Sequence, residues 1–385
     1  MPSALFSLAL VLSAHSALAV AADGAAAAPA PAPDVVVFTN GDQLTGKLVS
    51  AANGTVTFHS DVVGNVTVTW DKIKTLHSSQ QFAVVQQGQT VSRKTPSAAV
   101  PQGTVAVDNQ QLQVTPAAGA AQKEIPAKNA QYVIDEDSFK KQLWGHPGIT
   151  QGWTGSATFG VAMVEATQNS RSFNTAVNAV RAVPNASWLA TRERTTLGFT
   201  DVYGSLSQPG TPTTKTSVLN ASGEQDWYFS PRFYGLATAV FSHDYSQGLD
   251  LQQIYGGGAG YTVIKNARQE LDLKTDVHYE RQNFGATPGI EPPVITPSVN
   301  LIGMDFGDTY TLKLPHGMGF NQGLVFTPAF NEAKAFSAVL NAAVTFPSYK
   351  RFSFSLSTLD NYLNDPAYGS KKNSFQFTGG ITYSF

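Results

Sequence analysis

The sequence predicts an all-β protein: a transmembrane antiparallel up-and-down β-barrel of about twelve strands, preceded by a small periplasmic β domain. Three observations support this fold class. Only 14% of the 385 residues are charged, below the roughly 25% usual for soluble domains. From Gly152 onward, apolar and polar residues alternate with period two over long stretches, as they do on strands with two unlike faces. Outside the N-terminus, no apolar run is long enough for a membrane helix.

The composition excludes several classes of function. Lys and Arg number 25 against 27 Asp and Glu, giving a net charge of −2, and no basic run is present. We therefore expect no nucleic-acid partner. The chain has no cysteine, which excludes disulfides, thiolate metal sites and cysteine nucleophiles. The sequence implies no cofactor, and we expect a monomer.

The N-terminus has the pattern of an export signal. Residues 1–21 form the expected signal peptide: Ala4–Val20 is apolar, and the small residues Ala19 and Ala21 suit cleavage. The leader carries no Lys or Arg, which departs from the usual charged start. Because the apolar stretch is shorter than the roughly 20 residues of a membrane span, cleavage is favoured over anchoring. Residues 22–33 are an Ala/Pro-rich linker.

Residues 34–137 are predicted to form a periplasmic β-rich module. Alternating apolar residues surround Asn40-Gly41 and Asn53-Gly54, which are typical hairpin turns. Residues 55–76 align weakly with 111–132, matching Val56 with Leu112, so internal duplication and chance similarity both stay open. The next segment has two interpretations: a short helix capped by Asp137 and ending at Trp144, or a polar linker. We predict that residues 138–151 are a linker.

Residues 152–385 form the predicted barrel. The clearest strand is the last, where apolar residues and a glycine alternate with Gln376, Thr378, Gly380, Thr382 and Ser384; the alternating apolar set is Phe375, Phe377, Gly379, Ile381, Tyr383 and Phe385. Turn signals divide the segment into about twelve strands, an even number as bacterial outer-membrane barrels require. The longest predicted loop contains Pro288, Pro292, Pro293 and Pro297.

Closure of this sheet follows from the absence of water in lipid. Backbone N–H and C=O groups there must be paired with one another, which a closed sheet achieves. Aromatic residues near predicted strand ends would form interfacial girdles; they are Trp153, Trp188, Trp227, Tyr228, Tyr349 and Tyr383.

Charged residues gather on one face of a single predicted strand. Asp272, Lys274, Asp276, His278 and Glu280 alternate with apolar residues and lie about 7 Å apart on that face. Together with Glu224 and Asp226, which share a face with Asn220 on another strand, they are the candidate lumen-lining residues. We interpret them as a pore wall or internal salt-bridge network rather than an active site.

The remaining motifs do not predict chemistry. A His and a Ser two residues apart, as in barrel phospholipases, occur only at His77 and Ser79, outside the barrel. His243-Asp244 or His278 with Glu280 could ligate a metal, yet no spacing supplies a third ligand. Gly256–Gly258 lacks the Lys-Ser/Thr pair of a phosphate loop and instead predicts relief of crowding or sharp curvature. We therefore predict no catalytic residues and no enzyme.

The closing segment Phe375–Phe385 (FQFTGGITYSF) resembles the YdiY-like salt-induced outer-membrane protein family, known as domain of unknown function 481. The segments Asn40–Lys47 and Val66–Ile73 resemble the periplasmic module that often precedes that barrel. The resemblance implies an exported outer-membrane barrel of undefined activity. Its alternating end also resembles the signal read by the barrel-assembly machinery, here Ile381, Tyr383 and Phe385, although a lipid-facing last strand has the same pattern.

These inferences predict a protein of the cell outer membrane, in contact with outer-membrane lipid, with its N-terminal module in the periplasm. No partner of residues 34–137 is identified. The expected function is a passive narrow pore or a structural component of the envelope. Two alternatives stay open: a barrel-embedded hydrolase acting on lipid or peptide, and a secreted carbohydrate-binding β-sandwich.

Overall fold

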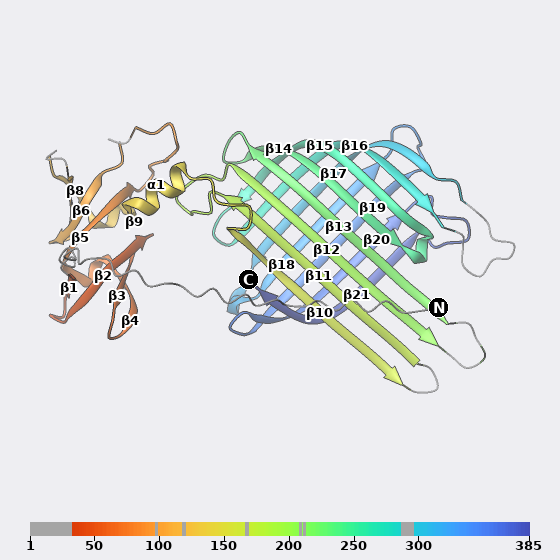
Figure 1. Cartoon of the computed structure of the whole chain (residues 1–385), viewed down its shortest axis with the longest axis horizontal. Helices are drawn as coiled ribbons and strands as arrows, with labels where there is room; N and C mark the ends of the chain where they lie inside the picture. The colour runs from red at the N-terminus through yellow and green to blue at the C-terminus, as the bar shows by residue number, and fades with distance from the viewer. Residues whose placement is uncertain are drawn as a thin grey trace, which may run out of the picture.

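The computed structural model describes residues 33–96, 99–117, 121–165, 169–207, 210, 213–285 and 296–385. The expected signal peptide 1–21, the linker up to residue 32, and Pro288, Pro292 and Pro293 lie outside the described residues. A small β domain and a large β-barrel follow one another along the longest axis (Figure 1). Within the described ranges, no helix has the length and apolar character needed to cross a membrane.

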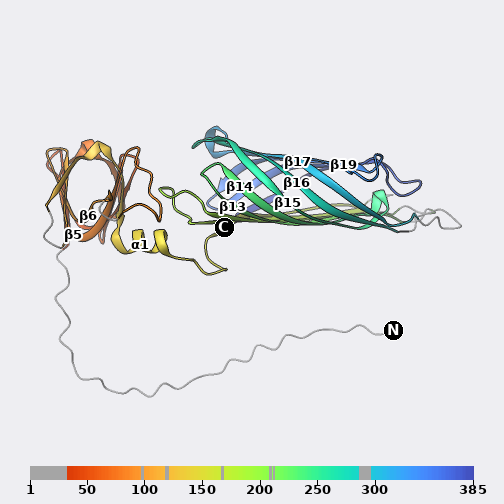
Figure 2. The same ribbon diagram turned by 90° about the horizontal axis from the view of Figure 1, so that it is seen from above.

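The N-terminal domain is a sheet that folds back on itself (Figure 2). Its strands follow the order β4-β3-β2-β1-β5-β6-β7-β8, and β9 pairs with both β2 and β5. Phe58, Phe82 and Leu112 are among the fully buried core residues. The strands are β1 (Asp34–Phe38), β2 (Gln43–Ala52), β3 (Thr55–Ser60), β4 (Gly64–Thr69), β5 (Ile73–Gln86), β6 (Gln102–Asp108), β7 (Gln111–Thr115), β8 (Lys123–Pro126) and β9 (Ala130–Asp135).

Two halves of this domain have the same order of elements. Strands β3 and β4 are followed by the 3-10 turn Trp70–Lys72 and then β5, and strands β7 and β8 are followed by the 3-10 turn Ala127–Asn129 and then β9. Val56 and Leu112, which the alignment matched, are both buried in the shared core. The common order favours internal duplication over chance similarity.

Helix α1 (Glu136–Trp144) closes the N-terminal domain. Its N-cap is Asp135, whose side chain accepts a hydrogen bond from the backbone N–H of Ser138 at 2.9 Å, so Asp137 is not the cap. Phe139 and Leu143 pack into a second core cluster with residues of the sheet. The structure thus differs from the linker expected for 138–151, because burial of these two side chains fixes its first half as a helix.

The second part is a closed barrel of twelve antiparallel strands, as predicted. Each strand pairs with the next, and β21 pairs with β10. The strands are β10 (Trp153–Glu165), β11 (Asn169–Val183), β12 (Glu193–Ser207), β13 (Thr214–Tyr228), β14 (Phe233–Asp244), β15 (Leu249–Lys265), β16 (Gln269–Phe284), β17 (Val299–Lys313), β18 (Gly319–Pro328), β19 (Phe336–Tyr349), β20 (Phe352–Leu363) and β21 (Asn373–Ser384).

The alternation of residue types sorts the side chains between the two faces of this wall. Phe375, Phe377 and Ile381 lie on the outside, each at least 62% exposed. On the inside of the same strand, Thr382 exchanges hydrogen bonds with Thr158 of β10 and Ser355 of β20, both at 2.6 Å. The outside of the barrel is therefore apolar at this strand, and the inside carries small hydroxyl groups.

The seam between the first and last strands is short. Ser156–Phe159 of β10 pair with Ile381–Ser384 of β21, which gives a ladder of four residue pairs. Two backbone hydrogen bonds between Gly155 and Phe385, of 3.2 and 3.0 Å, extend it at the end nearest the N-terminal domain. Among the described strands, every other neighbouring pair in the barrel has a longer ladder.

The loops at the two ends of the barrel differ in length. At the end shared by the N-terminal domain and the C-terminus (Figure 1), most connections are short: 229–232, 266–268, 314–318 and 350–351. The opposite end carries the short connections 166–168 and 245–248 and the longer connections 208–213, 285–298, 329–335 and 364–372. The exception near the N-terminal domain is the connection 184–192, which contacts that domain.

Trp188 makes this contact. Its ring stacks on Phe139 with centroids 4.8 Å apart, and its indole N–H donates to Gln142 Oε1 at 2.9 Å. Leu189 forms an isolated parallel bridge with Val91. The expectation that Trp188 and Tyr228 belong to membrane girdles is thus not met, because Trp188 joins the two domains and the Tyr228 ring lies beside Arg194 inside the barrel.

Candidate functional site in the barrel interior

Strand β16 supplies most of the charge in the barrel interior. Asp272, Asp276, His278 and Glu280 are all buried there, and Lys274 lies in the same row. The intervening residues Leu273, Val277 and Tyr279 are exposed on the outside. The period of the strand alone explains this sorting, since successive side chains point to opposite faces.

A first network centres on Arg194 of β12. Its Nε donates to Asp226 Oδ2 of β13 at 2.6 Å, and its Nη1 lies 2.8 Å from Asp272 Oδ2 of β16. Glu270 Oε1 is 3.6 Å from the same Nη1. The guanidinium also lies 5.1 Å from the centre of the Tyr234 ring. One cation therefore joins carboxylates from strands that are not neighbours in the sheet.

A second ion pair runs parallel to the first. Lys274 Nζ of β16 lies 2.6 Å from Glu224 Oε2 of β13. The structure thus brings Glu224, Asp226, Asp272 and Lys274 together in one ionic network across β14 and β15. Asn220 does not join it, and its buried Nδ2 has no hydrogen-bond partner among the described residues.

A third group surrounds His278. Its Nδ1 lies 3.0 Å from Asp276 Oδ1 and 3.8 Å from Asp305 Oδ1 of β17. Its Nε2 lies 4.0 Å from Glu280 Oε2 and makes no hydrogen bond to any residue that the structure describes. These atoms of Asp276, His278 and Asp305 are close enough together to hold a single metal ion.

Neighbouring polar side chains hold two of these carboxylates in place. Gln252 and Gln282 both donate to Glu280 Oε1, at 2.5 and 2.6 Å. Thr327 of β18 donates its hydroxyl to Asp305 Oδ1 at 2.6 Å. The carboxylates are therefore fixed in position by neutral donors.

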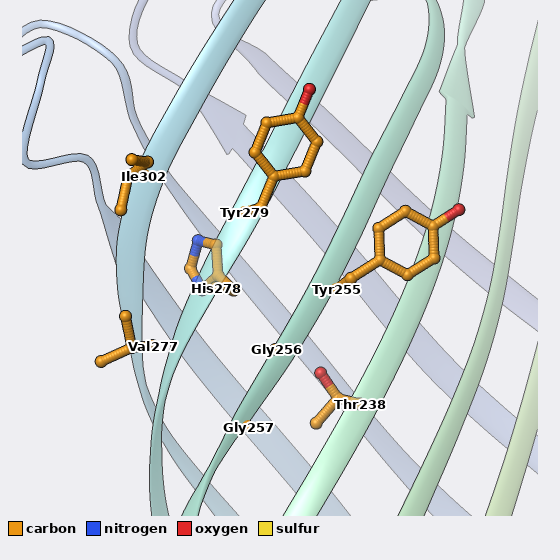
Figure 3. Close-up of a pocket in the computed structure, with 8 residues that line it drawn as sticks. All are labelled: Thr238, Tyr255, Gly256, Gly257, Val277, His278, Tyr279 and Ile302. Atoms are coloured by element: carbon orange, nitrogen blue, oxygen red, sulfur yellow. The ribbon is translucent and has the colours of Figure 1, made fainter.

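Glycines make room for this group, as the sequence predicted for Gly256–Gly258. A Cβ on Gly256 would lie 2.9 Å from both Asp276 Oδ1 and His278 Cβ. A Cβ on Gly303 would lie 2.8 Å from His278 Nε2. On the outer face, the same glycine stretch leaves a depression of about 500 Å³ (Figure 3); exposed Tyr255, Val277, Tyr279 and Ile302 surround it.

A family model described as "Protein of unknown function, DUF481" matches residues 157–385, more than half of the chain. The chain belongs to the DUF481 family. The match begins inside β10 and includes all of the other eleven strands of the DUF481 barrel. No curated protein matches the sequence.

The DUF481 barrel is also similar to three solved structures. The β domain of the Bordetella autotransporter BrkA has 13% identity and a TM-score of 0.30, with 60% of this chain and 97% of that chain covered. The translocator domain of NalP from Neisseria meningitidis has 10% identity and a TM-score of 0.32, covering 60% and 87%. An outer-membrane channel from Pseudomonas putida F1 has 12% identity and a TM-score of 0.32, covering 62% and 100%.

Sequence reasoning missed seven members of the interior groups in the DUF481 barrel, which are Arg194, Tyr234, Gln252, Glu270, Gln282, Asp305 and Thr327. A signal for Asp305 was present, because it alternates with Met304 and Phe306 as the residues of β16 do. Arg194 gave no such signal, because its neighbours Glu193 and Thr195 are also polar. Their partners come from distant segments, so the groups themselves were not readable.

The other candidates lie apart. His77 and Ser79 are on an exposed face of β5 in the N-terminal domain. His243 Nδ1 is 2.8 Å from the backbone oxygen of Asp250, and its neighbour Asp244 is buried, so these two side chains do not share a site. Ile381, Tyr383 and Phe385 are exposed on or just after the last strand of the DUF481 barrel; their role as an assembly signal stays a prediction.

Proposed function

We propose that this DUF481 chain is an outer-membrane β-barrel whose polar interior serves as a narrow passive pore, with the N-terminal domain in the periplasm. The observation that carries the proposal is the contrast between the two faces of a closed barrel. Large apolar side chains are exposed on the outside, and the inside holds the charged and hydroxyl side chains together with buried apolar ones such as Leu236 and Ile254. A barrel in lipid requires this arrangement.

The outer face supports a lipid environment. Phe159, Phe199, Val277, Phe306 and Phe377 are between 37% and 63% exposed and come from β10, β12, β16, β17 and β21. An apolar surface of this extent is rare on proteins dissolved in water. The closed barrel also replaces the alternative of a soluble carbohydrate-binding sandwich.

The lengths of the connections support the orientation. Outer-membrane barrels have short turns on the periplasmic side and longer loops outside the cell. The N-terminal domain and Phe385 lie at the end with the short turns (Figure 1). We therefore propose that the connection 285–298 is extracellular.

The inside of the wall supports a pore. One side carries the ionic network, and the other carries the small hydroxyls of Thr158, Ser355 and Thr382. The Lys274 side chain is 24% exposed although it faces inward and pairs with Glu224. Its contact with solvent favours a wet interior. The ion pairs across β14 and β15 also brace the wall, which would suit a structural component of the envelope.

We propose no enzymatic activity. The His77 and Ser79 pair lies in the N-terminal domain, outside the barrel. Among the described residues of the barrel interior, His278 contacts carboxylates and no hydroxyl that it could activate. The alternative of a hydrolase is tested by incubating the purified protein with panels of lipids and peptides. Cleavage of either would contradict our proposal.

Single-channel recording in planar bilayers tests the pore. We expect small, uniform current steps, and a shift of ion selectivity toward cations in Lys274→Gln, which removes an interior positive charge. The matched control is its neighbour Leu273→Ala on the outer face, which should leave selectivity unchanged. Absence of current steps from folded protein would reject the pore and leave the structural role.

Release from membranes by alkali without detergent would reject the membrane barrel.

A further inference from the structure

We propose that Asp276, His278 and Asp305 bind one divalent transition-metal ion, such as Zn²⁺, inside the barrel, and that Glu280 orients the imidazole. This inference goes beyond the proposed pore, because neither a passive pore nor the family match assigns a metal. It rests on the positions of the ligand atoms, on an unpartnered buried nitrogen and on the local charge.

The ligand atoms are spaced for a single ion. His278 Nδ1 is 3.0 Å from Asp276 Oδ1 and 3.8 Å from Asp305 Oδ1, and one ligand atom from each residue falls within 4.8 Å of the others. Two ligands of a tetrahedral zinc ion, each about 2.1 Å from it, are about 3.4 Å apart. The two distances from His278 Nδ1 bracket this value, so the proposal requires only side-chain rotations that bring the two carboxylate oxygens to the same spacing.

The second nitrogen of His278 points to the same interpretation. The residue is only 3% exposed, yet Nε2 has no hydrogen-bond partner within the described part of the chain. When Nδ1 binds a metal, Nε2 carries the proton, and metal-bound histidines usually donate that proton to a carboxylate or carbonyl. Glu280 Oε2 is 4.0 Å away and within reach of a small adjustment.

The surroundings of Glu280 prepare it for this role. Both glutamine amides, from Gln252 and Gln282, donate to Oε1, which leaves Oε2 available to His278. Asp305 receives the Thr327 hydroxyl on Oδ1. The carboxylate that would orient the histidine and one of the ligands are thus both held by neutral donors.

The charge of this group is not balanced by protein cations. In the part of the chain that the structure describes, no Lys or Arg forms an ion pair with Asp276, Glu280 or Asp305. By contrast, Asp226, Asp272 and Glu224 each pair with Arg194 or Lys274. Buried carboxylates need a counter-charge. A protonated imidazole supplies one positive charge against three carboxylates, and a divalent ion supplies two.

The donor set selects the type of ion. One imidazole and two carboxylates suit Zn²⁺ or a similar first-row ion, whereas Ca²⁺ prefers six or more oxygen ligands. Asp305 remains 17% exposed, so an ion can reach the group from the interior. The site would leave at least one coordination position for water.

Metal binding by the untagged full chain, purified in detergent and stripped with a chelator, tests this proposal. We expect one Zn²⁺ per folded chain by elemental analysis after dialysis, with no comparable uptake of Ca²⁺. Affinity measured by titration should fall at least about 10-fold in Asp305→Asn and His278→Gln and about 10-fold in Glu280→Gln. His243→Gln and Asp272→Asn are the matched controls and should bind as the wild type does.

The folded state of each variant is checked by its heat-modifiable migration, and Glu280→Gln tests the proposal even if a ligand variant fails to fold. X-ray absorption at the zinc edge gives a second readout, with one nitrogen and two carboxylate ligands expected. Folded wild-type protein that binds no Zn²⁺ would overturn the proposal and leave His278 as the internal cation. Unchanged affinity in folded His278→Gln and Asp305→Asn would place any bound ion elsewhere.

Discussion

Arg194 contacts side chains of three other strands in the barrel interior, which are β13, β14 and β16. Its guanidinium reaches Asp226 of β13 and Asp272 of β16 while it belongs to β12. Because both carboxylates are buried, each depends on this cation for its counter-charge. Loss of the Arg194 side chain would therefore leave both buried carboxylates without their counter-charge and destabilise the folded barrel.

Replacing this cation should destabilise the barrel. We expect Arg194→Met to lower the free energy of unfolding by about 3 kcal/mol, because it leaves two buried carboxylates unpaired. Urea unfolding in lipid vesicles measures the change. Lys265→Met is the control: its Nζ is 3.9 Å from Glu270 on a more exposed side chain, and the expected change is below about 1 kcal/mol. Equal losses in the two variants would contradict this account.

At the scale of a single element, β15 shows how glycines shape the wall. Gly256, Gly258 and Gly260 face inward, where β16 and β14 bring Asp276, His278 and Tyr234 against the backbone. A Cβ on Gly258 would overlap Thr275 O and lie 2.5 Å from Asp276 Cα. Gly257 faces the other way, and its nearest contact would be Leu236 O at 3.6 Å.

These two neighbours give a matched pair of variants. We expect Gly258→Ala to destabilise the barrel by about 2 kcal/mol, since the backbone of β16 must move. Gly257→Ala should change the stability by less than about 0.5 kcal/mol. The fraction that keeps folded migration after heating at a series of temperatures measures both. A Gly257→Ala variant as unstable as Gly258→Ala would show that backbone freedom, not space, is the reason for the glycines.

The same scale shows what the sequence can and cannot predict. Alternation identified which face of β16 is polar, because the strand period sorts side chains without knowledge of any partner. It did not identify Arg194 as the partner of Asp226 and Asp272, since that contact depends on how the barrel curves across β14 and β15. Helix α1 was assigned to a linker for the same reason: the burial of Phe139 depends on Trp188, which lies 49 residues later.

At the scale of the whole molecule, the two domains meet through a small apolar contact. Trp188 and Leu189 of the barrel pack against the cluster that contains Phe139 and Leu143 of α1. Apart from the linker 145–152, this contact positions the N-terminal domain at the barrel end. Its loss should therefore loosen the domain without unfolding the barrel.

A reactive probe can test this junction, because the natural chain has no cysteine. In a Leu143→Cys background, the thiol should react slowly with a maleimide, since Leu143 is buried. We expect Trp188→Ala to raise that rate severalfold, and Trp144→Ala, which removes an exposed neighbour, to leave it nearly unchanged. Equal rates in all three proteins would show that Trp188 does not hold the domains together.

The four-pair ladder between β10 and β21 makes one line of the wall different from the rest. Past Phe159 and Ile381, near Gly379 and Gly380, the ladder ends while both strands continue. Fewer backbone bonds mean that less energy is needed to separate two strands. We therefore expect the contact between β10 and β21 to separate before the other strand pairs of the barrel when the protein unfolds.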